Sequence, residues 1–207
     1  MLLVEKYRPT KISDFIGIES AREDAAALIA KPYSSAWCFV GESGTGKTTL
    51  AQAIAGELGA ELHHIPSQNC TVETVKQLRH KLAFAPMFGA RWHVVIVDEA
   101  DEMSPAAENA WLSLTDSTNR PVDTIIIFTC NSTEKLKQRF LSRTFVVKFS
   151  NYGIQKETAE MLAEIWKKET NGASPLPNFA RIVKEANGNV RESLQVLQRL
   201  IARANRA

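Results

Sequence analysis

The 207-residue sequence has only three cysteines, and they stand apart from one another. Cys38, Cys70 and Cys130 form neither a C-x-x-C pair nor a cysteine–histidine cluster. Isolated cysteines of this kind argue against a disulfide framework and against a structural zinc site. We therefore expect a reducing, cytoplasmic setting.

Long apolar runs, a marked net charge and internal repeats are also absent. No apolar run approaches the length of a membrane span, and Glu5, Lys6 and Arg8 interrupt the start. We therefore expect no signal peptide and no membrane partner. The formal net charge of +2 is too small to name a partner. Residues 1–150 hold 16 Lys and Arg against 17 Asp and Glu, and residues 151–207 hold nine against six. The second part therefore permits nucleic-acid contact without requiring it.

One glycine-rich stretch stands out from this ordinary composition. Gly41-Glu42-Ser43-Gly44-Thr45-Gly46-Lys47-Thr48 fits the pattern G-x-x-x-x-G-K-[ST] of phosphate-binding loops. An apolar run of strand type precedes it, and a helix-forming stretch begins at Thr49. In this arrangement backbone N–H groups and the helix dipole bind phosphate, Lys47 reaches the β- and γ-phosphates, and Thr48 offers a hydroxyl to Mg²⁺. The segment from Gly41 to Thr49 therefore predicts a nucleoside-triphosphate site.

Two later apolar runs end in polar side chains. His93–Val97 suits a strand buried on both faces, and Asp98 and Glu99 follow it directly. Carboxylates at a strand end beside a phosphate loop are placed to hold Mg²⁺ and to orient an attacking water. Asp123–Thr129 is a similar run, followed closely by Asn131. Asn131 is either a plain turn residue or a side chain that positions water beside the γ-phosphate.

Apolar runs of strand type alternate with segments of helical periodicity over residues 1–150. This order predicts an α/β domain with a parallel, five-stranded sheet flanked by helices. Residues 151–207 contain no strand-like run and predict a small all-α lid domain. The expected strands are Trp37–Val40, Leu62–Ile65, His93–Val97, Asp123–Thr129 and Phe145–Phe149. The expected helices are Ser20–Ala30, a helix from Thr49, Val72–Ala85, Pro105–Asp116, Lys135–Leu141, Gln155–Thr170, Pro177–Ala186 and Val190–Arg203. Ser13 is expected to cap a short turn, and Asn189 with Glu192 a capping box.

Taken together, these segments resemble the AAA+ ATPases, and within them the small subunits of sliding-clamp loaders of the replication factor C type. The resemblance covers nearly the whole chain. The matching segments are Val4-Glu5-Lys6-Tyr7-Arg8-Pro9, Ile16-Gly17, the phosphate loop, Asp98-Glu99-Ala100-Asp101, Asn131, Ser142-Arg143-Thr144 and Gly188-Asn189-Val190-Arg191.

The resemblance implies a role for each candidate site residue. Asp98 holds Mg²⁺ with Thr48, and Glu99 is the catalytic base or orients the attacking water. Asn131 polarises that water, and Arg191 contacts the γ-phosphate from the lid of the same chain. Arg143 acts as an arginine finger in the site of a neighbouring subunit. The residues implied for the adenine pocket are Tyr7, Arg8, Pro9, Ile16 and Gly17.

The sequence departs from the family pattern at three places. Trp111–Leu114 stands where family members usually carry paired arginines, and Thr144 replaces a cysteine. The sequence also ends at Ala207, where the family continues into a helical collar domain. We expect either a truncated chain or a compact relative that assembles differently.

The function expected from the resemblance is a Mg²⁺-dependent ATPase whose site is completed at a subunit interface. ATP binding and hydrolysis would drive the loading of a sliding clamp on primer-template DNA, in an assembly with other AAA+ subunits. One alternative is a nucleotide-gated binding module with weak turnover or none. Another is a different AAA+ machine, such as a helicase loader or a branch-migration motor.

Overall fold

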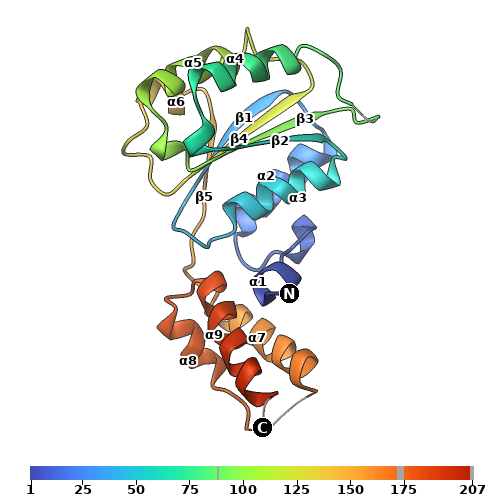
Figure 1. Ribbon diagram of the computed structural model, residues 1–207, viewed down its shortest axis with the longest axis vertical. Coiled ribbons are helices and arrows are strands. Elements are labelled where there is room, and N and C mark those ends of the chain that lie inside the picture. The colour runs from blue at the N-terminus through green and yellow to red at the C-terminus, as the bar shows by residue number, and fades with distance from the viewer. Residues whose placement is uncertain (88, 172–174, 206–207) are drawn as a thin grey trace.

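A computed structural model describes residues 1–87, 89–171 and 175–205 of the chain (Figure 1). Its centre is a five-stranded sheet in the order β2-β3-β4-β1-β5, in which all neighbouring strands are parallel. The predicted parallel five-stranded sheet is therefore confirmed. The strands are β1 (Ser35–Val40), β2 (Glu61–Pro66), β3 (His93–Asp98), β4 (Thr124–Cys130) and β5 (Phe145–Lys148).

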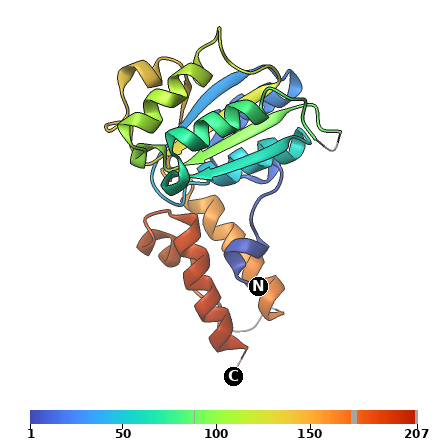
Figure 2. The ribbon, with the colours of Figure 1, turned by 45° about the horizontal axis from the view of Figure 1, so that its top comes forward.

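Helices cover both faces of the sheet (Figures 1 and 2). One face packs against α2 (Glu19–Ala30) and α3 (Lys47–Glu57), and the other against α4 (Val72–Lys81), α5 (Pro105–Thr115) and α6 (Gln138–Leu141). Side chains of the central strands alternate between the two resulting cores, which is why those strands are apolar at nearly every position.

A group of three helices follows the sheet: α7 (Gln155–Thr170), α8 (Phe179–Glu185) and α9 (Val190–Ala204). They share a core of their own, around Leu162 and Leu197. The short α1 (Leu3–Lys6) packs into the same core, and the backbone N–H of Leu3 donates to the side-chain oxygen of Gln198 at 2.7 Å. The start of the chain thus lies against its C-terminal helices (Figure 2), while the predicted domain boundary near residue 151 stays a prediction.

Several predicted helices are longer than the observed ones. α4 ends at Lys81 rather than Ala85, because the amides of Ala83 and Phe84 turn back to carbonyls three residues earlier. α6 begins at Gln138 rather than Lys135. α8 begins at Phe179 rather than Pro177, because Asn178 caps it by accepting from the backbone N–H of Arg181.

Of the two predicted capping features, the Ser13 cap is wrong and the Asn189 capping box is confirmed only in its first half. Ser13 lies inside a 3₁₀ turn, η1 (Ile12–Asp14), and makes no capping bond there. Asn189 does cap α9, since its side chain accepts from the backbone N–H of Glu192. The reciprocal half of the box is absent, because the N–H of Asn189 donates to the carbonyl of Ala186 instead. None of the described helices is long and apolar enough to cross a membrane.

Candidate nucleotide-binding site

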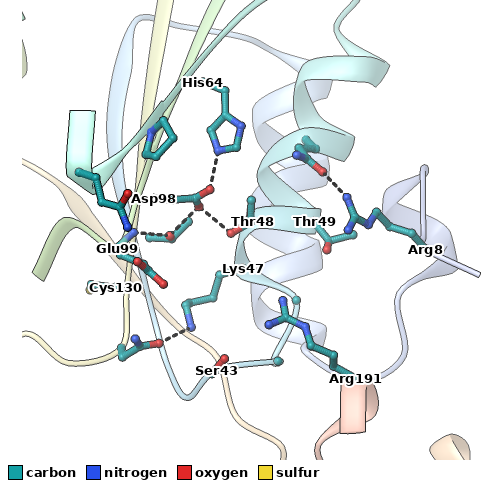
Figure 3. Close-up of a pocket in the computed structure, with 17 residues that line it drawn as sticks. Arg8, Ser43, Lys47, Thr48, Thr49, His64, Asp98, Glu99, Cys130 and Arg191 are labelled. Atoms are coloured by element: carbon teal, nitrogen blue, oxygen red, sulfur yellow. Dashed lines mark hydrogen bonds and ion pairs between the residues drawn. The ribbon is translucent and has the colours of Figure 1, made fainter. Parts of the chain in front are cut away.

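The carboxyl ends of β1, β3 and β4 meet at one edge of the sheet and carry the predicted site residues (Figure 3). The glycine-rich loop follows β1, Asp98 ends β3, and Asn131 follows β4. A cavity of about 450 Å³ opens at this edge. Its lining includes Arg8, Ser43, Gly44, Gly46, Lys47, Thr48, Thr49, His64, Gln68, Asp98, Glu99, Asn131 and Arg191.

The glycine-rich loop needs glycine for two physical reasons. Gly44 and Gly46 have φ values of +82° and +92°, which side chains rarely tolerate. A Cβ at Gly44 would also lie 2.3 Å from Oδ1 of Asn189, the residue that caps α9. Nδ2 of the same asparagine donates to the carbonyl of Ser43 at 3.0 Å. The loop is therefore bound directly to the last helix of the chain.

Lys47 is buried at the start of α3 and points toward the loop rather than away from it (Figure 3). Its ammonium donates to the carbonyls of Gly41 and Glu42, at 2.5 and 2.9 Å, and to Oδ1 of Asn131 at 3.2 Å. Burial lowers the pKa of Lys47, and Arg191 contributes in the same direction. Lys47, Asn131 and Arg191 thus share one small region of the cavity.

Asp98 is the centre of a polar network. Its Oδ1 accepts from the hydroxyl of Thr48 at 2.6 Å and from that of Thr129 at 2.9 Å. Its Oδ2 contacts Nε2 of His64, a residue of β2. A carboxylate beside a threonine hydroxyl is the oxygen donor set that Mg²⁺ prefers, so Thr48 and Asp98 fit the predicted metal.

Thr129 and His64 were not predicted from the sequence as site residues. Thr129 lies at the carboxyl end of β4, and only the register of the sheet shows that it meets Asp98. His64 stands in a short strand whose position in the sheet the sequence did not specify.

Glu99 follows β3 in a left-handed conformation, with φ of +52°, which is uncommon for a residue other than glycine. Its backbone N–H donates to the Thr129 hydroxyl at 3.2 Å, and its side chain faces the cavity. Two residues later, Asp101 accepts from the backbone N–H groups of Asn131 and Ser132, at 3.2 and 3.4 Å. The turn after β3 therefore presents Glu99 and also holds the segment that carries Asn131.

A second cavity of about 140 Å³ adjoins the first, with Arg8, Gly44, Gly46, Thr49 and Arg191 in both linings. Four of the five residues predicted for the adenine pocket line it: Tyr7, Arg8, Pro9 and Ile16. Thr45 of the glycine-rich loop lines it as well, and α7 and α9 close it with Met161 and Leu194.

Gly17, the fifth predicted residue, lies beside this second cavity rather than in its lining. A Cβ there would stand 2.2 Å from Cγ2 of Ile154, so glycine allows close packing against a residue that does line the cavity. Tyr7 donates its hydroxyl to Glu169 of α7 at 2.5 Å. Burial and the Glu169 carboxylate raise the pKa of Tyr7 to about 12.

Arg143 lies apart from both cavities. Its Nη1 donates to the carbonyl of Arg139 at 2.6 Å, and its Nε lies 3.4 Å from Oδ2 of Asp116. About a third of its side chain is exposed. Trp111, which the resemblance places where family members usually carry paired arginines, is fully buried and donates to the sulfur of Cys70 at 3.0 Å.

Comparison with known proteins identifies the class. Residues 37–152, more than half of the chain, match the ATPase family associated with various cellular activities (AAA). The chain therefore belongs to the AAA family of ATPases.

Within that class, the chain is similar along nearly its whole length to subunits of replication factor C. It is 27% identical over 205 residues to the replication factor C large subunit of Thermococcus kodakarensis, covering 96% of this chain and 40% of that protein. It is 28% identical over 205 residues to replication factor C subunit 4 of Encephalitozoon cuniculi, covering 97% of this chain and 65% of that protein. The chain thus spans between two fifths and two thirds of the length of these relatives.

Among solved structures, the fold is similar to that of the RuvB Holliday junction branch migration motor of Thermotoga maritima. The TM-score is 0.77, with 93% of this chain and 64% of that chain covered. At 20% identity, this similarity concerns the fold alone.

Proposed function

We propose that this chain is a Mg²⁺-dependent ATPase of clamp-loader type, acting in an assembly with other AAA+ subunits. The observation that carries the proposal is the gathering of Lys47, Asp98, Glu99, Asn131 and Arg191 around one cavity, with Arg143 outside it. The similarity to replication factor C subunits supports the clamp-loader branch. A sliding clamp and primer-template DNA are the partners proposed on that basis.

Each residue of the cavity then has a role in phosphoryl transfer, which depends mainly on positioning and charge. Lys47 neutralises the β- and γ-phosphates, and Arg191 approaches the γ-phosphate from α9. Glu99 orients or deprotonates the attacking water, and Asn131 polarises it. Thr48 and Asp98 hold Mg²⁺, which would neutralise charge on the phosphate oxygens. The second cavity, with Tyr7 at its edge, receives the adenine.

Arg143 has a different proposed role, since it is not among the described residues that line the two cavities of the nucleotide site. We assign it to the site of a neighbouring subunit, where it stabilises the charge that develops on the γ-phosphate. An arginine finger of this kind contributes on the order of 10³-fold or more to turnover. The isolated chain should therefore hydrolyse ATP slowly.

We also propose that residues 151–207 act as a lid on the nucleotide site. The contacts of Asn189 with the glycine-rich loop, and of Met161 and Leu194 with the second cavity, support this proposal. In such an arrangement, occupancy of the nucleotide site and the position of α7–α9 depend on one another.

The test is ATP turnover measured on the chain alone, with primer-template DNA, and with DNA plus a sliding clamp. We expect stimulation by the complete mixture and its loss in Glu99→Gln, with ATP binding retained. Stimulated turnover that survives Glu99→Gln unchanged would show that Glu99 has another role. ATP binding without turnover under every condition would favour a nucleotide-gated binding module, and stimulation by a branched junction but not by a clamp would favour a branch-migration motor.

A further inference from the structure

Three potential metal ligands meet at the amino-terminal ends of β2 and β3, at the opposite end of these strands from Asp98. They are Glu61 and His63 of β2 and His93 of β3, and their ligand atoms all lie within 4.8 Å of one another. Glu61 and His93 are direct neighbours in the register of the two strands. His63 is two residues beyond Glu61, so it projects from the same face.

The distances between these atoms suit a tetrahedral ion. Nε2 of His63 and Nδ1 of His93 share a hydrogen bond of 3.1 Å, which a metal ion would replace. The first nitrogen lies 3.7 Å from Oε1 of Glu61, and the second lies 3.7 Å from Oε2 of the same carboxylate. Zinc–nitrogen bonds of about 2.0–2.1 Å at tetrahedral angles separate two ligand atoms by about 3.3 Å. Small rotations of the Glu61 side chain would close the difference between the observed 3.7 Å and the tetrahedral separation of about 3.3 Å.

Neighbouring backbone groups already orient two of the three ligands. Nε2 of His93 faces the carbonyl of Phe84 at 3.0 Å, so it carries the proton and leaves the lone pair of Nδ1 directed at the other ligands. Glu61 accepts from the backbone N–H of Met87 at 2.6 Å. Hydrogen bonds of this kind, from a histidine to a carbonyl and from an amide to a carboxylate, are the usual support of ligands in zinc sites.

The partial burial of these three side chains and the negative charge of Glu61 also suit a bound cation. The His93 side chain is 3% exposed, whereas those of His63 and Glu61 are 13% and 24% exposed, so the group opens toward solvent on one side. Lys81 opposes a cation to some extent, while the Glu61 carboxylate favours one.

We propose that Glu61, His63 and His93 form a zinc site with three protein ligands and one position left to water. Imidazole and carboxylate ligands in a four-coordinate arrangement suit Zn²⁺. The isolated cysteines argued against zinc, but this ligand set contains no cysteine and depends on strand register. The site is separate from the nucleotide cavity: five residues along a strand, at about 3.3 Å each, place it roughly 16 Å from Asp98.

A bound zinc ion would hold the segment between α4 and β3 against the sheet, because Phe84 and Met87 of that segment bond to two of its ligands. Lys81 and Arg91 flank the segment and are exposed, so trypsin can report on it. Zinc should slow cleavage at these two residues and raise the midpoint of thermal unfolding.

The test is a zinc titration of the full chain after treatment with a chelator, in excess Mg²⁺ so that Asp98 does not compete for zinc. We expect one zinc ion per chain, with a Kd on the order of a micromolar or tighter. Cobalt(II) in its place should give the visible absorption of a tetrahedral site. His63→Gln and Glu61→Gln should each weaken binding by at least about ten-fold.

His80→Gln is the matched control, because His80 is exposed on α4 and outside the group. It should bind zinc as the unmodified chain does. Equal thermal unfolding of the metal-free His63→Gln variant and the unmodified metal-free chain establishes that the variant folds. A chain that binds no zinc in this range, or a His63→Gln variant that binds it as tightly as the unmodified chain, would overturn the proposal.

Discussion

Asn189 donates a hydrogen bond of 3.0 Å from its side-chain amide to the backbone carbonyl of Ser43, joining the start of the last helix to the glycine-rich loop. The same side chain accepts from the N–H of Glu192 and so caps α9. One residue therefore stabilises a helix of the C-terminal group and contacts the loop that is proposed to bind phosphate. Residues 146 positions apart in the chain are linked in this way.

The first prediction concerns Asn189→Ala, which removes both bonds. Loss of the cap should destabilise the chain by about 0.5–2 kcal/mol. ATP binding should weaken as well, because the loop loses its contact with α9. Asn178→Ala is the control: it removes the cap of α8, and among the described residues no hydrogen bond joins that helix to the loop. Denaturant unfolding and titration with a fluorescent ATP analogue measure the two effects. Equal loss of ATP affinity in both variants would show that the Ser43 contact is unimportant.

The second prediction concerns Gly44→Ala. The new methyl group would lie 2.3 Å from Asn189 Oδ1 in a backbone with φ of +82°, so the loop must move. The left-handed conformation alone costs about 1–2 kcal/mol for a residue with a side chain. By that estimate ATP affinity should fall by about 5- to 30-fold, as measured by the same titration.

Gly56→Ala is the matched control for that substitution. Gly56 lies in α3, and nothing stands within 4 Å of a Cβ added there. The change should leave ATP binding unaltered and increase the free energy of unfolding by up to about 1 kcal/mol, because alanine favours the helix. If Gly44→Ala behaves like Gly56→Ala, the glycine at position 44 is not required for the loop.

The third prediction tests whether the active site is shared between subunits. Arg143→Ala and Glu99→Gln should each reduce stimulated turnover by about 10³-fold, if Arg143 acts on a neighbour's nucleotide. A mixture of the two inactive variants should regain activity, because some interfaces then pair an intact Glu99 with an intact Arg143. Turnover that remains absent in every ratio of the two would contradict a role for Arg143 in a neighbouring site.

The fourth prediction is a pH dependence at Tyr7. Its pKa is raised to about 12, by burial first and then by the Glu169 carboxylate that accepts its hydroxyl bond. A raised pKa means that the folded state holds the proton more tightly than the unfolded state. The contribution to stability is therefore complete below about pH 10 and is lost as the pH rises toward 12.

Tyrosinate absorbance, followed together with circular dichroism, measures this ionisation. The chain has three tyrosines, and one ionisation step near pH 12 should disappear in Tyr7→Phe. Tyr152→Phe is the control, since Tyr152 is 89% exposed and should leave that step in place. If the titration of Tyr7→Phe still contains the ionisation step near pH 12, another tyrosine is responsible for it.

Much of this site was predictable because many of its functional groups belong to residues that are adjacent in the sequence. The segment Gly41–Thr48 predicts a phosphate-binding turn because its glycines allow positive φ and its flanks form a strand and a helix. Asp98 was predictable as the polar end of a buried run. The helix boundaries were less predictable: α4 ends earlier and α6 begins later than expected, because a local turn replaces the helix at that end.

The sequence by itself determined the order of the strands and helices, the parallel sheet and the phosphate-binding turn, since local propensity and burial decide these within a few residues. Only the tertiary structure decided which distant residues meet. His64 reaches Asp98, Asn189 reaches the glycine-rich loop, and Glu61 stands beside His93. These contacts depend on strand register and on the packing of α9 against the glycine-rich loop. Register and packing minimise the free energy of the whole sheet and its helices, so no short segment of sequence specifies them.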